Sequence, residues 1–172
     1  TIQEHKQKLA GLKIAYIGDG ANNMANSYLV ACAMAGMHVS VASPAAYLPN
    51  PKVVAHAEAI AAKTNGSIEV HGDPFSAIRN ADVVVTDTWI SMGQEAQKQS
   101  RIEAFEGYTI DAAMMAHANS DAIFMHCLPA YRGYEVAAEV IDGPQSVIWD
   151  EAENRLHAQK ALLAFLADQK AN

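Results

Sequence analysis

The feature that most constrains the fold is a regular alternation between short apolar runs and longer stretches with helical spacing. The runs, each of a length suited to one buried strand, are residues 12–17, 39–42, 67–70, 82–86, 122–125 and 146–149. The helical stretches are about residues 23–35, 51–63, 74–79, 112–118, 134–140 and 151–168. Strands that are apolar on both faces and alternate with helices indicate a mostly parallel sheet.

Right-handed crossovers between such strands predict an α/β fold: a doubly wound, mostly parallel sheet with helices on both faces, which is a Rossmann-like domain. The last helix, about residues 151–168, has apolar residues at three- and four-residue spacing. We expect it to bury Leu156, Leu163 and Phe165 or their neighbours, and we expect Asp150 to be its N-cap.

The segment 1–10 looks like a helix that begins before the chain does and ends at Gly11. We therefore expect an interdomain helix there and take residues 1–172 as one domain of a longer protein. A chain of 172 residues without an internal linker is of ordinary size for one domain.

Charge and hydropathy exclude several classes of protein. The net charge is -7 and no basic stripe is present, so we expect no nucleic-acid partner. Apolar runs are far shorter than a bilayer requires, so we expect no membrane partner. Cys32 and Cys127 lie in apolar contexts and do not form a disulfide framework, which favours a reducing, cytoplasmic compartment.

Polar residues collect at the predicted carboxyl ends of four strands. These are residues 18–23 (GDGANN), 86–93 (TDTWISMG), 126–129 (HCLP) and 149–155 (WDEAENR). Ligands of open α/β sheets bind beyond the carboxyl ends of the strands, so we expect these segments to line one pocket.

Simpler interpretations of the same residues remain open. Gly18 and Gly20 match the start of a dinucleotide fingerprint, but Asn23 replaces its third glycine and residues 42–44 lack the expected acid. Asn22 and Asn23 could be turn and N-cap residues, and Cys127 could be a small buried hydrophobe. Similarly, His126 alone is typical of a core histidine, and the bond before Pro129 is a plausible cis peptide.

Together the four segments resemble the ornithine carbamoyltransferase family. DTWISMG resembles its Ser-Met-Gly loop, HCLP its His-Cys-Leu-Pro signature, DEAENRLHAQKAL the start of its last helix, and GDGANN its Gly-Asp-x-x-Asn-Asn turn. The resemblance implies the carboxy-terminal, ornithine-binding domain. The amino-terminal carbamoyl-phosphate domain, with its Ser-Thr-Arg-Thr and His-Pro-x-Gln motifs, is absent from this sequence.

The resemblance also implies site residues. For ornithine, Asn23 and Asp87 would hold the α-amino group, while Ser91 and the backbone amide of Met92 would bind the α-carboxylate. For carbamoyl phosphate, the implied residues are Cys127, Leu128 and Arg155. Of these residues, Cys127, Asp87 and Arg155 would be catalytic.

The implied reaction transfers the carbamoyl group of carbamoyl phosphate to the ornithine side-chain amine, giving citrulline and phosphate. It needs no metal and no organic cofactor. The implied partners are the two substrates, the missing domain and, for the complete enzyme, a homotrimer; the piece alone is expected to be inactive. Two alternatives stay open: a related carbamoyltransferase for another amine such as putrescine, and a non-catalytic ornithine-binding domain.

Overall fold

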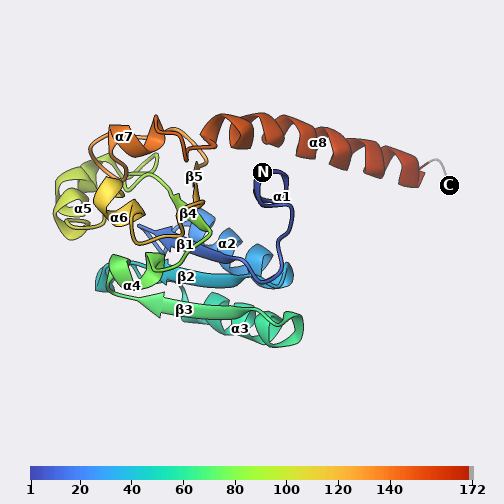
Figure 1. The fold of residues 1–172 in the computed structure, drawn as a ribbon, viewed down its shortest axis with the longest axis horizontal. Coiled ribbons are helices and arrows are strands. Elements are labelled where there is room, and N and C mark those ends of the chain that lie inside the picture. The colour runs from blue at the N-terminus through green and yellow to red at the C-terminus, as the bar shows by residue number, and fades with distance from the viewer. Residues whose placement is uncertain (171–172) are drawn as a thin grey trace.

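The computed structural model describes residues 1–170 and contains one five-stranded, all-parallel sheet with helices on both faces (Figure 1). The predicted α/β, doubly wound class is therefore confirmed. The strands are β1 (Lys13–Ile17), β2 (His38–Ala42), β3 (Ser67–His71), β4 (Val83–Thr86) and β5 (Ile123–His126). The helices are α1 (Ile2–Lys6), α2 (Asn23–Met34), η1 (Ala45–Tyr47), α3 (Pro51–Thr64), α4 (Pro74–Ile78), η2 (Glu95–Gln97), α5 (Lys98–Ala104), α6 (Ala112–Met115), α7 (Ala138–Ile141) and α8 (Ile148–Lys170).

The strand order is β3-β2-β1-β4-β5, so the chain winds outward from β1 and then returns to build the other half from β4. Neighbouring strands β1 and β4 therefore send their connections to opposite sides. Ligands of such folds bind beyond the carboxyl ends of the strands at this topological switch point, and we call this region of the structure the crevice.

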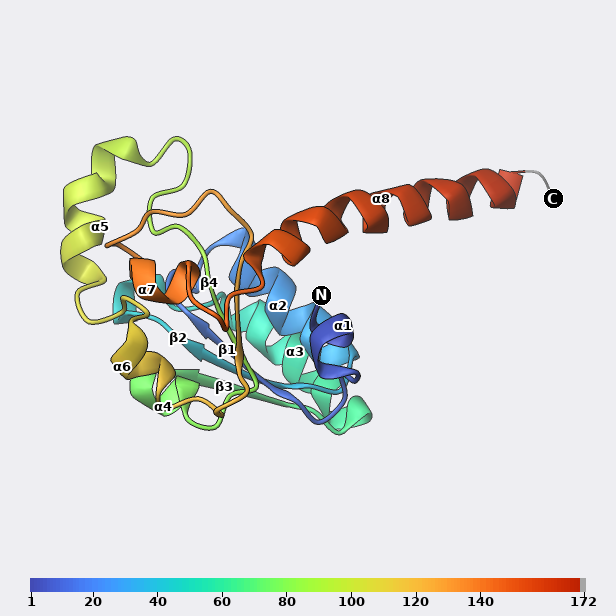
Figure 2. The ribbon, with the colours of Figure 1, turned by 45° about the horizontal axis from the view of Figure 1, so that its top comes forward.

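Side chains of each central strand alternate between two apolar clusters. Ile14 and Tyr16 of β1 pack on the side of α2 and α3, whereas Ala15 and Ile17 pack on the side of α4 to α7. Figure 2 shows α2 and α3 on one side of the sheet and α4 and α6 on the other. A sheet buried on both faces holds its strand ends, and hence the crevice, in fixed positions.

The predicted sixth strand, residues 146–149, is wrong. The backbone N–H of Phe124 donates to Gln145 O (2.8 Å) and that of Val147 donates to Phe124 O (3.0 Å), which makes one isolated bridge beside β5. From Ile148 the chain is helical. Short apolar runs fit either a buried strand or the buried start of a helix, and here the helix begins.

The opposite edge of the sheet, β3, is partly exposed. Glu69 and His71 lie on the same face of this strand, and Nε2 of His71 is 3.3 Å from Oε2 of Glu69. The two edges therefore differ: residues 145–147 run along β5, whereas β3 presents charge to its surroundings.

The prediction for α8 needs two corrections. The helix begins at Ile148, so Asp150 lies in its first turn and is not the N-cap. Its apolar residues are not buried: Leu163 is 68% exposed and Phe165 is 60% exposed. Both ribbon views show why, since α8 leaves the body of the domain and extends past it (Figures 1 and 2). Helical spacing predicts an apolar face, but it does not say what that face covers.

The amino-terminal helix is shorter than predicted and lies beside the start of α8. It ends at Gln7, whose φ of 60° is left-handed. His5 Nε2 lies 2.8 Å from Asp150 Oδ2, and Asn154 Nδ2 donates to Thr1 Oγ1 (2.9 Å). The role of this segment as an interdomain helix stays a prediction.

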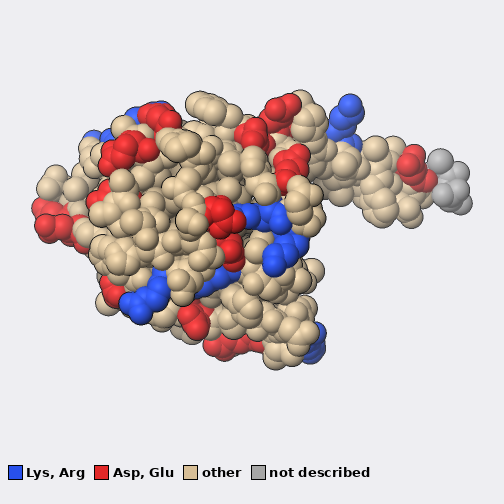
Figure 3. Space-filling model, in the orientation of Figure 1, with Lys and Arg blue, Asp and Glu red and all other residues tan. Residues whose placement is uncertain are grey.

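In the connections, the predicted helix 134–140 is helical only over Ala138–Ile141, and α5 was not predicted. None of the described helices is long and apolar enough to span a bilayer. On the face drawn in Figure 3, acidic and basic side chains are interspersed in small groups.

Candidate active site at the carboxyl ends of β1, β4 and β5

Three strand ends meet at the carboxylate of Asp87, which follows β4 and is buried. Asn22, in the loop after β1, donates from Nδ2 to Asp87 Oδ2 (3.1 Å). The thiol of Cys127, after β5, donates to Asp87 Oδ1 (3.3 Å), and the Thr88 N–H donates to the same oxygen (2.8 Å). The predicted convergence of these segments is thus present at one carboxylate.

The asparagine at this point is Asn22. It is also the N-cap of α2, because its Oδ1 accepts the Ala25 N–H (2.8 Å) while its amide nitrogen serves Asp87. Asn23 is the first residue of α2 and is exposed at the crevice. The structure therefore joins Asn22 to Asp87 directly, and the ornithine contact of Asn23 stays a prediction.

Burial raises the pKa of the Cys127 thiol to about 12, with the Asp87 charge and hydrogen bond and the charge of Glu151 acting in the same direction. The thiol is therefore protonated at neutral pH. A protonated thiol is a poor nucleophile but can donate a hydrogen bond, as it does to Asp87.

A buried pair fixes the turn that follows β5. The Leu128 N–H donates to Nδ1 of His126 (2.9 Å), so the ring hydrogen resides on Nε2, which lies 3.3 Å from Glu135 Oε1. Glu135 also accepts the Tyr131 N–H (2.6 Å), and both His126 and Glu135 are fully buried. Leu128 has a φ of 58°, and the Leu128–Pro129 peptide is cis, as predicted. His126 is a buried core histidine, as in the simpler interpretation; its Nδ1 accepts the hydrogen bond that shapes the turn beside Cys127, whereas its Nε2 makes no hydrogen bond.

Glu151 joins the first turn of α8 to the same strand end. Its Oε2 accepts the His126 N–H (2.9 Å), its Oε1 accepts from Tyr28 Oη (3.4 Å), and burial raises its pKa. Arg155 lies one turn further along the same face of α8, where it is exposed. Within residues 1–170, the Arg155 side chain makes no hydrogen bond or ion pair, and its contact with the carbamoyl group stays a prediction.

The predicted carboxylate-binding loop lies beyond Asp87. The Ser91 N–H donates to Gln94 Oε1 (3.2 Å), Ser91 is half-buried, and the Met92 side chain is 98% exposed. A buried ion pair, which the sequence pattern does not predict, lies at the base of this loop. Arg101 Nη1 donates to Asp19 Oδ2 at 2.8 Å, and both residues are buried.

Two further properties limit what the site can bind. A side chain at Gly20 would lie 2.5 Å from Ser43 Oγ and 2.7 Å from Pro49 Cδ, so the loop after β2 occupies the space beside the glycine turn. This agrees with the poor dinucleotide fingerprint. Ligand atoms of Asp87, His126 and Cys127 lie within 4.8 Å of one another, but a metal there would have to displace the thiol hydrogen that Asp87 accepts.

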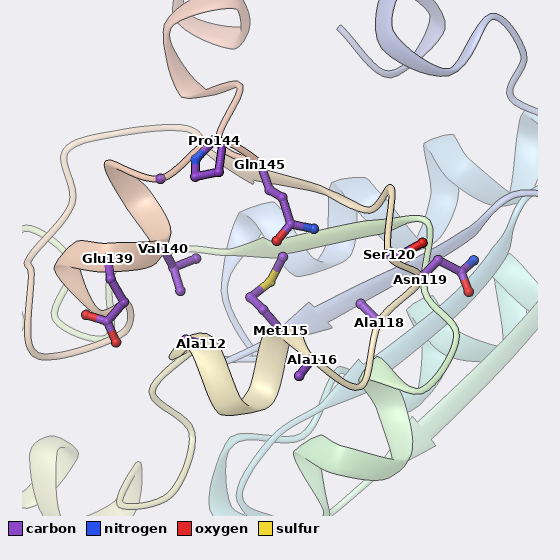
Figure 4. A pocket seen from close by; sticks show the side chains of 11 residues that line it. Ala112, Met115, Ala116, Ala118, Asn119, Ser120, Glu139, Val140, Pro144 and Gln145 are labelled. Atoms are coloured by element: carbon purple, nitrogen blue, oxygen red, sulfur yellow. The ribbon is translucent and has the colours of Figure 1, made fainter.

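A hollow of about 390 Å³ lies between α6, α7 and the segments before β5 and α8 (Figure 4). Asn119 and Ser120 on its wall precede β5, so this hollow is at the amino end of the strand. It is separate from the crevice, which contains the buried carboxylate and thiol.

Residues 10–166 match the family model described as aspartate/ornithine carbamoyltransferase, Asp/Orn binding domain. The chain belongs to this family. The matched residues include every polar segment of the crevice, from the β1 loop to the first turns of α8.

Relatives agree in sequence and in structure. The chain is 62% identical over 169 residues to an ornithine carbamoyltransferase of Renibacterium salmoninarum, covering 98% of this chain and 54% of the relative. The ornithine carbamoyltransferase of Pyrococcus furiosus superposes with a TM-score of 0.90 at 50% identity, over 95% of this chain and 52% of that one. The chain therefore spans about half the length of the curated relatives it matches.

An N-acetyl-L-ornithine transcarbamylase also superposes, with a TM-score of 0.82 at 33% identity, over 96% of this chain and 53% of that one. A carbamoyltransferase named for a different amine thus shares the fold. The fold alone does not select the amine, so the choice must depend on particular side chains in the crevice.

Proposed function

We propose that this chain is the ornithine-binding half of an ornithine carbamoyltransferase, a transferase that converts ornithine and carbamoyl phosphate to citrulline and phosphate. The observation that carries the proposal is Asp87, a buried carboxylate at the switch point with an amide and a thiol pointing at it. A cationic partner strongly stabilises the charged form of a desolvated carboxylate. The α-ammonium group of an amino acid is such a partner.

For ornithine, we propose that Asp87 and Asn23 hold the α-ammonium group, with Asn22 orienting Asp87. The α-carboxylate would bind to Ser91 and to the backbone amide of Met92. Support comes from the position of this loop, which directly follows Asp87 in sequence and exposes residues 92 and 93. Two separate segments of the chain would then bind the α-ammonium and the α-carboxylate groups of ornithine.

For the carbamoyl group, we propose contacts with Cys127, Leu128 and Arg155. Because the Leu128 N–H already donates to His126, the Leu128 carbonyl is the backbone group that can accept from the carbamoyl amide. The neutral thiol of Cys127 would lie near the reacting amine without becoming acylated. Arg155 would stabilise the developing oxyanion, since its guanidinium keeps its charge and aims several donors.

The reacting amine must lose a proton before it can attack. An amine with a pKa of about 10.4 is neutral in roughly one molecule in 2,500 at pH 7, which corresponds to about 4.6 kcal/mol. The neutral nitrogen forms the bond to the carbamoyl carbon, the bond from that carbon to the phosphate oxygen breaks, and the amine loses its remaining extra proton. Positioning of the amine and stabilisation of the oxyanion supply the catalysis, and no metal or organic cofactor is required.

The partner of the chain in this proposal is an amino-terminal carbamoyl-phosphate half. It would cover the apolar face of α8 and bring Arg155 over the crevice, with α1 and α8 as the segments that connect the halves. A homotrimer of the complete enzyme and a cytoplasmic location belong to the same proposal. The two free cysteines agree with a reducing compartment.

The test is citrulline formation by the complete enzyme, in which this chain follows its amino-terminal half, with ornithine and putrescine compared as substrates. We expect ornithine to be strongly preferred, because putrescine has no α-carboxylate for Ser91 and Met92. Preference for putrescine would identify a related carbamoyltransferase. Ornithine binding without turnover would identify a non-catalytic binding domain.

A further inference from the structure

A single arginine connects the two segments to which ornithine binding is assigned above. Arg101 lies on α5, and its side chain is 7% exposed although it carries a full charge. Its Nη1 donates to Asp19 Oδ2 (2.8 Å) and to Trp89 O (2.9 Å). A buried guanidinium is expensive unless it is paired and hydrogen-bonded, so these contacts define its position closely.

On one side, Arg101 holds both ends of the loop that carries Ser91 and Met92. Trp89 precedes the loop, and its carbonyl accepts from Arg101 Nη1. Gln97 follows the loop, and its Oε1 lies 3.4 Å from Arg101 Nε. Trp89 is itself fixed by stacking on Phe105 at 5.2 Å. The loop is therefore closed at its base, while its tip remains open to the crevice.

On the other side, Asp19 shapes the turn that presents Asn22. Its Oδ1 accepts the Ala21 N–H (2.9 Å), and its backbone oxygen accepts the Asn22 N–H (3.3 Å). Asn22 in turn donates to Asp87. The ion pair thus links the base of the carboxylate-binding loop to the turn that orients the ammonium-binding carboxylate.

The pair is enclosed by a third segment. The ring of Tyr47, in η1 after β2, lies 4.8 Å from the guanidinium carbon of Arg101 and 4.8 Å from the ring of Phe105. This aromatic cover removes water from the ion pair, which strengthens its electrostatic attraction.

We propose that Arg101 and Asp19 are positioning residues that set the separation between the ammonium-binding Asp87 and the carboxylate-binding Ser91, and thereby the preference for α-amino acids over simple diamines. The inference rests on the proposed function, because it uses those two contacts. Neither residue touches the substrate. Lysine cannot replace Arg101 here, since one ammonium lacks the planar fork that reaches Asp19, Trp89 and Gln97 together.

The test uses the complete enzyme with Arg101→Lys and Asp19→Asn, and with Arg79→Lys as the matched control. Arg79 is exposed and precedes β4 at the other end of the sheet. Three ligands are compared: ornithine, norvaline (ornithine without its side-chain amine) and putrescine (a diamine without the carboxylate). The measurements are KM for both substrates, inhibition constants for norvaline and putrescine, and Tm.

We expect Arg101→Lys to raise the KM for ornithine and the inhibition constant of norvaline together, by about tenfold or more, as for the loss of one well-placed polar contact. The putrescine constant and the KM for carbamoyl phosphate should stay within about twofold, because neither ligand spans the two segments. Asp19→Asn should act in the same direction with a smaller factor, and Arg79→Lys should change none of these values.

Equal weakening of norvaline and putrescine, or no weakening of either, would mean that the pair only stabilises the fold, and the inference would be wrong. If Arg101→Lys fails to fold, the same comparison with Asp19→Asn tests the inference. This variant is suitable because the asparagine side chain keeps an oxygen that can accept a hydrogen bond from Arg101. Failure of the proposed function would look different. The wild-type enzyme would then form no citrulline, whereas norvaline binding by calorimetry would still test the ion pair.

Discussion

The body of the domain buries most of its large apolar side chains, whereas its last helix exposes them. In the body, the sheet buries its side chains in two clusters, and polar groups at the strand ends have partners from neighbouring loops. Helix α8 instead exposes Leu156, Leu162, Leu163, Phe165 and Leu166 as it extends past the body. Exposed apolar side chains are ordinary when they are scattered singly, but a group of them on one extended helix is typical of a surface that contacts another protein segment.

For the proposed function, this difference distinguishes site residues that are fixed by contacts within the body from Arg155, which lies on the exposed helix. Asp87, Asn22 and Cys127 are fixed by contacts within the body. Arg155 is on α8, and in the proposed function its position depends on the amino-terminal half that would cover this helix. We therefore expect binding of the amino acid to be a property of this chain, and turnover to be a property of the complete enzyme.

The largest expected effect is on turnover by the isolated chain. Carbamoyl phosphate carries about two negative charges at neutral pH and needs several convergent donors. In the isolated chain the crevice is open and Arg155 is exposed, so water weakens each electrostatic contact with the ligand. Citrulline formation at millimolar substrates should be undetectable for the chain alone and measurable for the complete enzyme, with intact mass excluding contamination. Turnover by the chain at the level of the complete enzyme would mean that the phosphate site lies within it.

The second effect concerns stability, with one substitution made in each region. Phe124→Ala in β5 should lower the free energy of unfolding of the isolated chain by about 3–5 kcal/mol, because Phe124 is fully buried. Phe165→Ala in α8 should change it by less than about 0.5 kcal/mol, since its side chain is exposed. Urea denaturation measures both. In the complete enzyme the cost of Phe165→Ala should rise; a cost that stays near zero there would contradict burial of α8.

The third effect tests whether the body binds the ammonium group. Asp87→Asn should weaken ornithine binding to the complete enzyme by about 2–4 kcal/mol, the usual loss on breaking a buried charged pair. Carbamoyl phosphate affinity should change far less. Asp142→Asn, at an exposed aspartate, serves as the control. Unchanged ornithine affinity in calorimetry would remove Asp87 from the site.

The smallest expected effect is on thiol reactivity within the body. With a pKa raised to about 12, only about one Cys127 thiol in ten thousand is ionised at pH 8. Alkylation in a Cys32→Ser background should therefore accelerate about tenfold per pH unit between pH 8 and 10. Asp87→Asn should speed alkylation at a given pH, because it removes a negative charge that raises the pKa. A rate that levels off below pH 9 would mean that the thiol is not buried as described.

The five strands of the sheet could be predicted because each is a short apolar run whose alternate residues pack on opposite faces. Residues 146–149 form a similar run, but they make one isolated bridge at Ser146 and are helical from Ile148, and no local pattern distinguishes the two cases. Helix α5 escaped prediction because its buried residue is Arg101, which an apolar pattern does not count. The burial of α8 was wrongly predicted because spacing defines a face without naming its partner.

For the site, the segments that meet at the sheet edge could be predicted from the rule that parallel strands end together. The individual contacts could not. The side chain of Asn22 caps α2 with its oxygen and reaches Asp87 with its nitrogen, and only the geometry reveals that second contact. Asp19 and Arg101 are 82 positions apart in the chain, and each alone looks like an ordinary charged residue.

The unequal edges of the sheet have a consequence for contacts between separate molecules. An exposed strand edge offers free backbone groups to any strand of another chain, which is how many proteins aggregate. At β5 that approach is obstructed by residues 145–147. At β3, a strand of another chain would have to pair beside Glu69 and His71. Such pairing is unfavourable because it would remove water from charged side chains. The sheet is therefore limited to five strands by a covering segment at one edge and by charge at the other.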